Sequence, residues 1–99
     1  MATDKLLSAL AMCRGAGKLK IGFDAAMAAA QKNAIIVVVA SDISERTKKN
    51  VLLRCGDDME IVELPRTSTD IESVVGRKFV VAAVCDENFA KLIENQLNN

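Results

Sequence analysis

The chain has 99 residues, the size of one domain, and we expect residues 1–99 to fold as a single unit. Hydrophobic residues make up 51% of it, and only one Pro and five Gly interrupt it, which excludes a disordered or collagen-like protein. Thirteen basic and thirteen acidic side chains give a formal net charge of zero. This balance excludes a protein that coats nucleic acid or a membrane through its overall charge, and leaves room only for a local basic face.

In the first third of the chain, apolar residues recur at helical spacing, then at strand spacing, then again at helical spacing. A helix is predicted over residues 4–14, ended by Gly15 and Gly17, with an apolar stripe formed by Leu6, Leu7, Leu10 and Cys13. A short strand over residues 18–21 follows. A second helix is predicted over residues 23–32, because alanine, the best helix former, occupies five of its positions.

The middle of the chain predicts two strands with a helix between them. Residues 35–39 are apolar and β-branched without alternation, as expected of a central strand that is covered on both faces. Asp42 followed by Glu45 is a capping-box pattern, which predicts that Asp42 caps the next helix. Gly56 ends this helix, whose apolar stripe is Val51, Leu52 and Cys55. Alternation over residues 60–64 predicts a half-buried strand.

The last third predicts a helix, a strand and a second helix. Thr69 and Glu72 form a second capping-box pattern before a short helix that Gly76 ends. Residues 79–85 predict another strand, and Asp86 is expected to cap a last helix whose apolar face is Phe89, Leu92, Ile93 and Leu97. Helices alternate with strands throughout, which predicts an α/β fold: a three-layer α/β/α sandwich with one mixed sheet of about four strands.

The neutral total hides a separation of charge along the chain. Residues 57–99 have a net charge of −5, and residues 1–56 have a net charge of +5. The basic side chains of the first part are Lys5, Arg14, Lys18, Lys20, Lys32, Arg46, Lys48, Lys49 and Arg54. A basic surface is therefore compatible with the neutral total, although a chance scatter of solvated charges would give the same count.

Glycines near the second helix resemble a phosphate-binding loop only in part. Gly17 and Gly22 have the G-x-x-x-x-G spacing, but Phe23 and Asp24 follow where Lys and Ser or Thr must hold phosphates and magnesium. An acidic residue at that point would repel a triphosphate. We therefore exclude nucleotide hydrolysis.

Gly22 nevertheless precedes a helix whose first-turn amides are free to bind an anion. Lys18 and Lys20 lie just before it on one face of the short strand. A phosphodiester suits this combination of amides and ammonium groups. An ordinary glycine turn beside solvated lysines would give the same spacing.

Nothing in the sequence predicts an enzyme, a metal site or a cofactor. Histidine is absent, which excludes Cys-His and Ser-His nucleophilic machinery. The three cysteines, at positions 13, 55 and 85, have neither zinc-site nor disulfide spacing, and we expect them to act as small hydrophobic residues. The N-terminus lacks the apolar core of a signal peptide, and the apolar run 34–40 is too short to span a bilayer. We therefore expect a cytoplasmic protein that does not enter membranes.

Four separated segments agree in order and spacing with one known family. They are Arg14–Gly22, Ala40–Lys49, Val75–Lys78 and Asp86–Ile93. Through them nearly the whole chain resembles the ribosomal L-seven-Ae and L-thirty-e family of small RNA-binding proteins, and within it the bacterial, ribosomal-protein-like branch.

The resemblance implies a three-layer α/β/α fold and non-enzymatic binding of structured RNA, often a kink-turn. In the family, a glycine before the second helix lets the backbone approach RNA, and a loop before the last strand contacts an extruded nucleotide. The candidate RNA-binding residues carried over by position are Lys18, Lys20, Gly22, Phe23, Asp24, Ser41, Asp42, Arg77, Lys78 and Phe79.

The chain departs from the family pattern in the second helix. Asp24 stands where the family has Asn, Ala25 where it has Glu and Ala28 where it has Lys. A carboxylate accepts but cannot donate hydrogen bonds, and its charge opposes phosphate. If each lost base contact costs about 1–3 kcal/mol, as for protein–DNA pairs, two or three losses weaken binding roughly 10²-fold or more.

The sequence therefore predicts a protein that binds structured RNA, ribosomal or kink-turn-like, with weakened recognition of bases. The alternative is a protein-interaction or scaffold module that kept the fold and lost RNA binding. In that case the alanine-rich second helix would contact a protein partner or a second copy of the chain.

Overall fold

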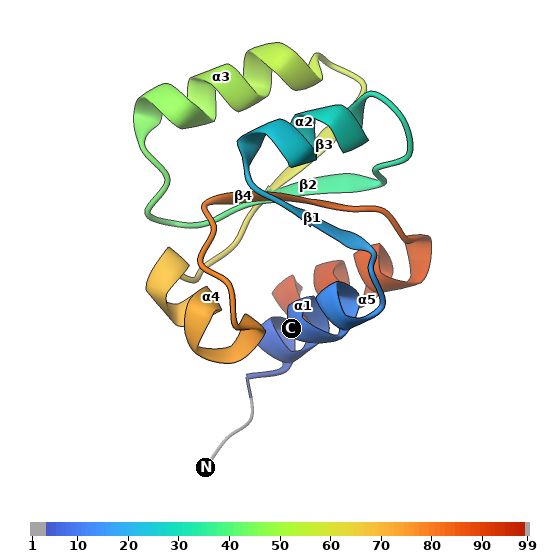
Figure 1. Cartoon of the computed structure of the whole chain (residues 1–99), viewed down its shortest axis with the longest axis vertical. Coiled ribbons are helices and arrows are strands. Elements are labelled where there is room, and N and C mark those ends of the chain that lie inside the picture. Colours follow the sequence, from blue (N-terminus) through green and yellow to red (C-terminus); the bar gives the residue numbers. More distant parts are fainter. Residues whose placement is uncertain (1–3, 99) are drawn as a thin grey trace.

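The structure is a computed structural model that describes residues 4–98. Helices and strands alternate along the chain, as predicted (Figure 1). In order they are α1 (Lys5–Gly15), β1 (Leu19–Ile21), α2 (Phe23–Ala30), β2 (Ile36–Val39), α3 (Glu45–Cys55), β3 (Glu60–Glu63), α4 (Ser68–Val75), β4 (Val81–Val84) and α5 (Glu87–Leu97).

The four strands form one mixed sheet in the order β1-β4-β2-β3. Strand β4 lies between β1 and β2 and is antiparallel to both, whereas β2 and β3 are parallel. The pairs Ile21↔Ala82 and Val39↔Val81 place the ends of β1 and β2 beside the start of β4. One end of the sheet therefore collects the segments that follow β1 and β2 and the segment that precedes β4.

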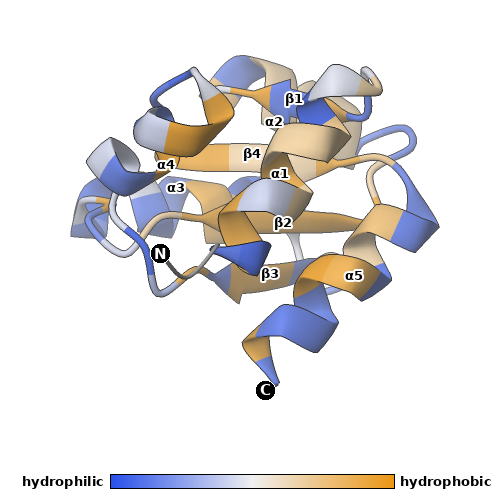
Figure 2. Ribbon diagram, turned by 90° about the horizontal axis from the view of Figure 1, so that it is seen from below, coloured by the Kyte–Doolittle hydropathy of each residue, from blue (hydrophilic) through white to orange (hydrophobic). Residues whose placement is uncertain are grey.

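Helices cover both faces of the sheet, which confirms the three-layer sandwich (Figure 1). Successive residues of the central strands point to opposite faces, so Ile36 and Val38 pack with α1, α4 and α5, while Val37 and Val39 pack with α2 and α3. All four side chains are buried, because the run of β-branched residues meets helices on both sides. Figure 2, which looks onto the sheet from the side of α1 and α5, shows β2 and β4 in the hydrophobic colour behind these helices.

Several predicted helix ends are confirmed. The Asp86 carboxylate accepts a hydrogen bond from the Phe89 N–H at the start of α5. Gly56 and Gly76, both with positive φ, end α3 and α4. Within residues 4–98, none of the helices has the length and apolar composition needed to cross a bilayer.

Two predicted caps are wrong. Ser44, not Asp42, caps α3, and its hydroxyl accepts a hydrogen bond from the Thr47 N–H. The capping box of α4 is formed by Thr67 and Asp70, two residues before the predicted pair. In both cases several residues that can cap a helix lie close together in the sequence, and tertiary contacts determine which of them is the N-cap.

The apolar stripe predicted for α3 is also narrower than expected. Val51 is fully buried, but Leu52 is 50% exposed and Leu53 is 75% exposed. The helix rests on the sheet through a single row of side chains, and two leucines therefore face solvent.

Asp42 instead joins the loop after β2 to the start of α4. Its two carboxylate oxygens accept hydrogen bonds from the Ser68 N–H at 2.8 Å and from the Ser68 hydroxyl at 2.7 Å. These bonds hold the pKa of the Asp42 carboxyl below its ordinary value of 3.8. The ionised carboxylate thus stabilises the fold by fixing a loop onto a neighbouring helix.

We predict that Asp42→Asn lowers the urea midpoint of unfolding at pH 7, with Asp58→Asn, in an exposed turn, as the matched control. A depressed carboxyl pKa adds stability above the unfolded-state pKa, and this stability disappears as the pH falls through the folded-state pKa. The midpoints of Asp42→Asn and wild type should therefore approach each other progressively as the pH falls below about 4. A difference that is constant from pH 7 to pH 2 would contradict this assignment.

Candidate functional site

The end of the sheet where β1 and β2 finish brings together most of the predicted site residues. The Gly22 N–H donates to the Val81 carbonyl and the Ala40 N–H donates to the Val80 carbonyl, both at about 3 Å. These bonds fix the start of α2 and the loop after β2 on either side of the segment that leads into β4. We call this region the sheet-end group; its members are Gly22, Phe23, Asp24, Ser41, Asp42, Arg77 and Lys78.

Gly22 supplies the backbone geometry at the start of α2. Its φ of 98° and ψ of 159° lie in a region that is almost exclusive to glycine. No side chain caps the helix, and the first helical N–H to bond within α2 is that of Ala26, which donates to the Gly22 carbonyl. The amides of the first turn are thus left to an external acceptor, and the positive end of the helix dipole adds to them.

Phe23 and Asp24 occupy the first turn of α2 in different ways. The Phe23 ring is half-buried against the layer formed by α2 and α3. The Arg54 guanidinium, from the far end of α3, lies over this ring at 5.8 Å from its centroid, within the range of a cation–π contact. Asp24 is exposed and adds a negative charge beside the free amides.

The loop after β2 is fixed by hydrogen bonds. The Ser41 N–H donates to the Arg66 carbonyl, and Asp42 binds Ser68 as described above. Lys78 lies near enough to Asp42 to lower the pKa of that carboxyl further. Because Ser68 already holds both carboxylate oxygens, Asp42 acts as a structural anchor in the unbound protein.

The segment before β4 contributes its charges and buries its aromatic ring. Arg77 and Lys78 are exposed, directly after the Gly76 that ends α4. Phe79 is 4% exposed and belongs to the core beneath α1, α4 and α5. Its ring is therefore not available for stacking on a ligand in this structure.

Lys18 and Lys20 lie along β1, which is an edge strand of the sheet. Lys18 is at the far end of the strand from the sheet-end group: its carbonyl accepts from the Cys85 N–H, about 13 Å from Gly22 at 3.3 Å per residue. Lys20 is nearer, two positions before Gly22. Both lysines lie near Cys85: burial raises the pKa of the Cys85 thiol, and the positive charges of the two lysines partly offset this rise. The structure therefore divides the predicted site into the sheet-end group and these two β1-edge lysines.

The cysteines do not resemble activated nucleophiles. Burial raises the pKa of the Cys13 thiol to about 12, and it also raises the pKa values of Cys55 and Cys85. Over residues 4–98, no group of three or more Cys, Asp or Glu side chains is placed to hold a metal ion.

Arg54 lies beside Phe23 of the sheet-end group, but no sequence motif indicated it. It belongs to none of the segments that suggested the site, and 31 positions separate it from Phe23 in the sequence. The available signal was the excess of basic residues before Gly56, which includes four side chains of α3: Arg46, Lys48, Lys49 and Arg54. Charge alone did not indicate which of them lies beside α2.

The fold is shared with solved structures, although the sequence is not. No protein-family model matches the chain, and no curated protein matches its sequence. A protein of unknown function from Bacillus halodurans is 24% identical, with a TM-score of 0.87 over 98% of this chain and 100% of that one. The 15.5 kD RNA-binding protein of Giardia lamblia is 15% identical, with a TM-score of 0.72 over 95% of this chain and 82% of that one. At these identities the likeness establishes the fold.

Proposed function

We propose that the protein binds structured RNA, ribosomal or kink-turn-like, through the sheet-end group and the β1-edge lysines. The observation that carries the proposal is the uncapped start of α2 at Gly22, with exposed Arg77 and Lys78 at the same end of the sheet. The fold that it shares with an RNA-binding protein of Giardia lamblia supports the same function.

The arrangement favours contacts with the RNA backbone. Amides at a helix N-terminus bind phosphate oxygens through hydrogen bonds and the helix dipole. Lys20 projects from β1 on the side of α2, and Arg77 and Lys78 approach from the segment before β4. A phosphate-dominated interface of this kind releases counterions on binding, so the affinity should fall steeply with salt concentration.

Recognition of bases is weakened in this proposal. Asp24, Ala25 and Ala28 are all exposed at the positions where the family resemblance places Asn, Glu and Lys. Alanine offers no hydrogen bonds to a base edge, and the Asp24 carboxylate repels phosphate. Shape and backbone contacts, which are the usual basis for recognising folded RNA, remain.

The first test measures the binding of labelled kink-turn RNA and of an unstructured RNA at several salt concentrations. Lys18→Ala/Lys20→Ala should weaken binding and lower the slope of log K against log salt by about 1.5, because two phosphate contacts disappear. Lys5→Ala/Lys91→Ala removes the same charge from exposed positions on α1 and α5 and should leave the slope unchanged. Equal and negligible binding by every protein would refute the proposal.

The second test restores the pattern that the resemblance implies. Asp24→Asn/Ala25→Glu/Ala28→Lys should tighten binding to kink-turn RNA by roughly 10²-fold, at about 1–3 kcal/mol for each restored base contact. Affinity for unstructured RNA should change much less, since it has no fixed base edges to present. A similar gain for both RNAs would show that net charge, rather than base recognition, had been restored.

A protein-interaction module is the second candidate, and a groove beside α2 favours it. The groove, of about 360 Å³, lies between β1 and α2 and has a mainly apolar lining formed by Lys20, Ala25, Ala28, Ala29, Lys32 and Asn33. Small side chains of this kind allow a second helix to approach closely.

If this face joins two copies of the chain, light scattering of the RNA-free protein should give the mass of a dimer. Ala28→Glu, which puts a charged side chain into the contact, should return the mass to that of a monomer. A monomer at all concentrations, together with salt-dependent RNA binding, would exclude self-association through this groove.

A further inference from the structure

Helix α3 has a concentration of positive charge, and none of its basic residues is among the candidate RNA-binding residues that the sequence motifs indicated. Between Glu45 and Cys55 it has four basic side chains and one acidic side chain. Lys48 forms an ion pair with Glu63 at 3.1 Å; over the described part of the chain, Arg46, Lys49 and Arg54 have no such partner. A helix that keeps three cations without counterions in its own fold is a candidate surface for a polyanion.

The contacts of α3 show which of these cations turn toward α2. The Arg54 carbonyl accepts a hydrogen bond from the Gln31 side chain at the end of α2, and its guanidinium lies over Phe23 at the start of α2. Arg54 thus extends back along α2, and its positive charge is placed at the first turn of that helix.

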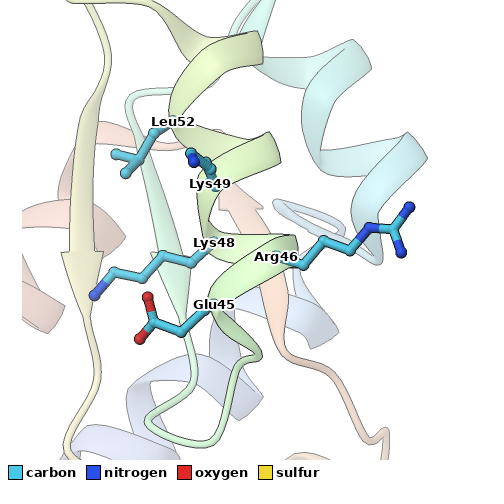
Figure 3. Close-up of a pocket in the computed structure, with 5 residues that line it drawn as sticks. All are labelled: Glu45, Arg46, Lys48, Lys49 and Leu52. Atoms are coloured by element: carbon cyan, nitrogen blue, oxygen red, sulfur yellow. The ribbon is translucent and has the colours of Figure 1, made fainter.

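Arg46 and Asn50 share the side of α3 that Arg54 occupies. The three residues are spaced i, i+4 and i+8, which places them in one row along a helix. Figure 3 shows Arg46 extending from α3 toward α2, whereas Lys48 extends from the other side toward β3. The row therefore lies along an exposed side of α3, with both arginines directed toward α2.

We propose that Arg46 and Arg54 extend the RNA site from the first turn of α2 onto the exposed side of α3, so that one RNA strand crosses both helices. This inference rests on the proposed function and extends it to a helix that the sequence motifs left out. The guanidinium groups bind phosphate oxygens in a fork-like geometry, and Asn50 adds a polar contact between them.

Charge and position favour a polynucleotide over an acidic protein as the occupant. The row ends at the same turn of α2 that offers free amides, so a single chain of regularly spaced phosphates can contact both elements.

The test compares Arg46→Ala/Arg54→Ala with Lys5→Ala/Lys91→Ala, which removes equal charge from α1 and α5. With labelled kink-turn RNA, the arginine variant should bind about tenfold more weakly and lose about 1.5 from the slope of log K against log salt. The control should match wild type. Because both arginines are exposed, thermal unfolding should be nearly unchanged and serves as the check on folding.

Arg54→Lys distinguishes the effect of the positive charge on RNA binding from the effect of the planar guanidinium group. It keeps the positive charge but loses the planar group over Phe23, so the salt slope should stay near that of wild type while the affinity falls by a few-fold. In the wild-type protein, the Nε–Hε resonance of Arg54 should shift when the RNA is added.

Different results would contradict the role of α3 and the proposed RNA binding. If wild type binds RNA and Lys18→Ala/Lys20→Ala weakens it, but Arg46→Ala/Arg54→Ala matches the control, the inference is wrong and the proposed function stands. An acidic protein would then be the better candidate for α3. If wild type binds no RNA at any salt concentration, both fail together.

Discussion

The position of β4 between β1 and β2 determines what the rest of the structure can present to a ligand. Because β4 is antiparallel to both neighbours, its start lies beside the ends of the other two strands. Hydrogen bonds from the Gly22 N–H to the Val81 carbonyl and from the Ala40 N–H to the Val80 carbonyl fix this arrangement at the end of the sheet where β1 and β2 finish. Three loops that are distant in the sequence thus meet at one end, and each brings a different donor: backbone amides, hydroxyl groups and cationic side chains.

The separation of charge along the sequence is kept only in part by the layers of the sandwich. Residues 1–56 contribute α2 and α3, which cover one face of the sheet and contain Lys32, Arg46, Lys48, Lys49 and Arg54. The other face is covered by α4 and α5 from the acidic second part, together with α1 from the basic first part, which contributes Lys5 and Arg14. On that side Glu94 lies against Glu60, which raises the pKa of the Glu94 carboxyl. A formal net charge of zero is thus compatible with a local excess of positive charge on α3.

The fold could be predicted because its signals are local, whereas the site depends on which loops meet. The run of β-branched residues after Ala34 specified a strand buried on both faces, and Gly56 and Gly76 specified helix ends. Asp42 was misassigned because a polar residue before a helix can cap it or bind elsewhere, and the partner, Ser68, is 26 positions away. The same limit applies to Arg54, since its relation to Phe23 exists only after α2 and α3 have packed.

The first turn of α2 combines two opposing requirements. Gly22 provides the open backbone but no side-chain cap, so the helix gains from a negative charge in its first turn, which Asp24 supplies through the dipole. The same carboxylate stands where a phosphate would approach. Neutral Asn at this position would favour RNA but would give α2 less support from the dipole. Arg54 adds a positive charge from outside the helix, because its guanidinium lies over the adjacent Phe23 ring. The charge that an anion would meet at the start of α2 therefore depends on the packing of α3 against α2 as well as on the residues of α2 itself.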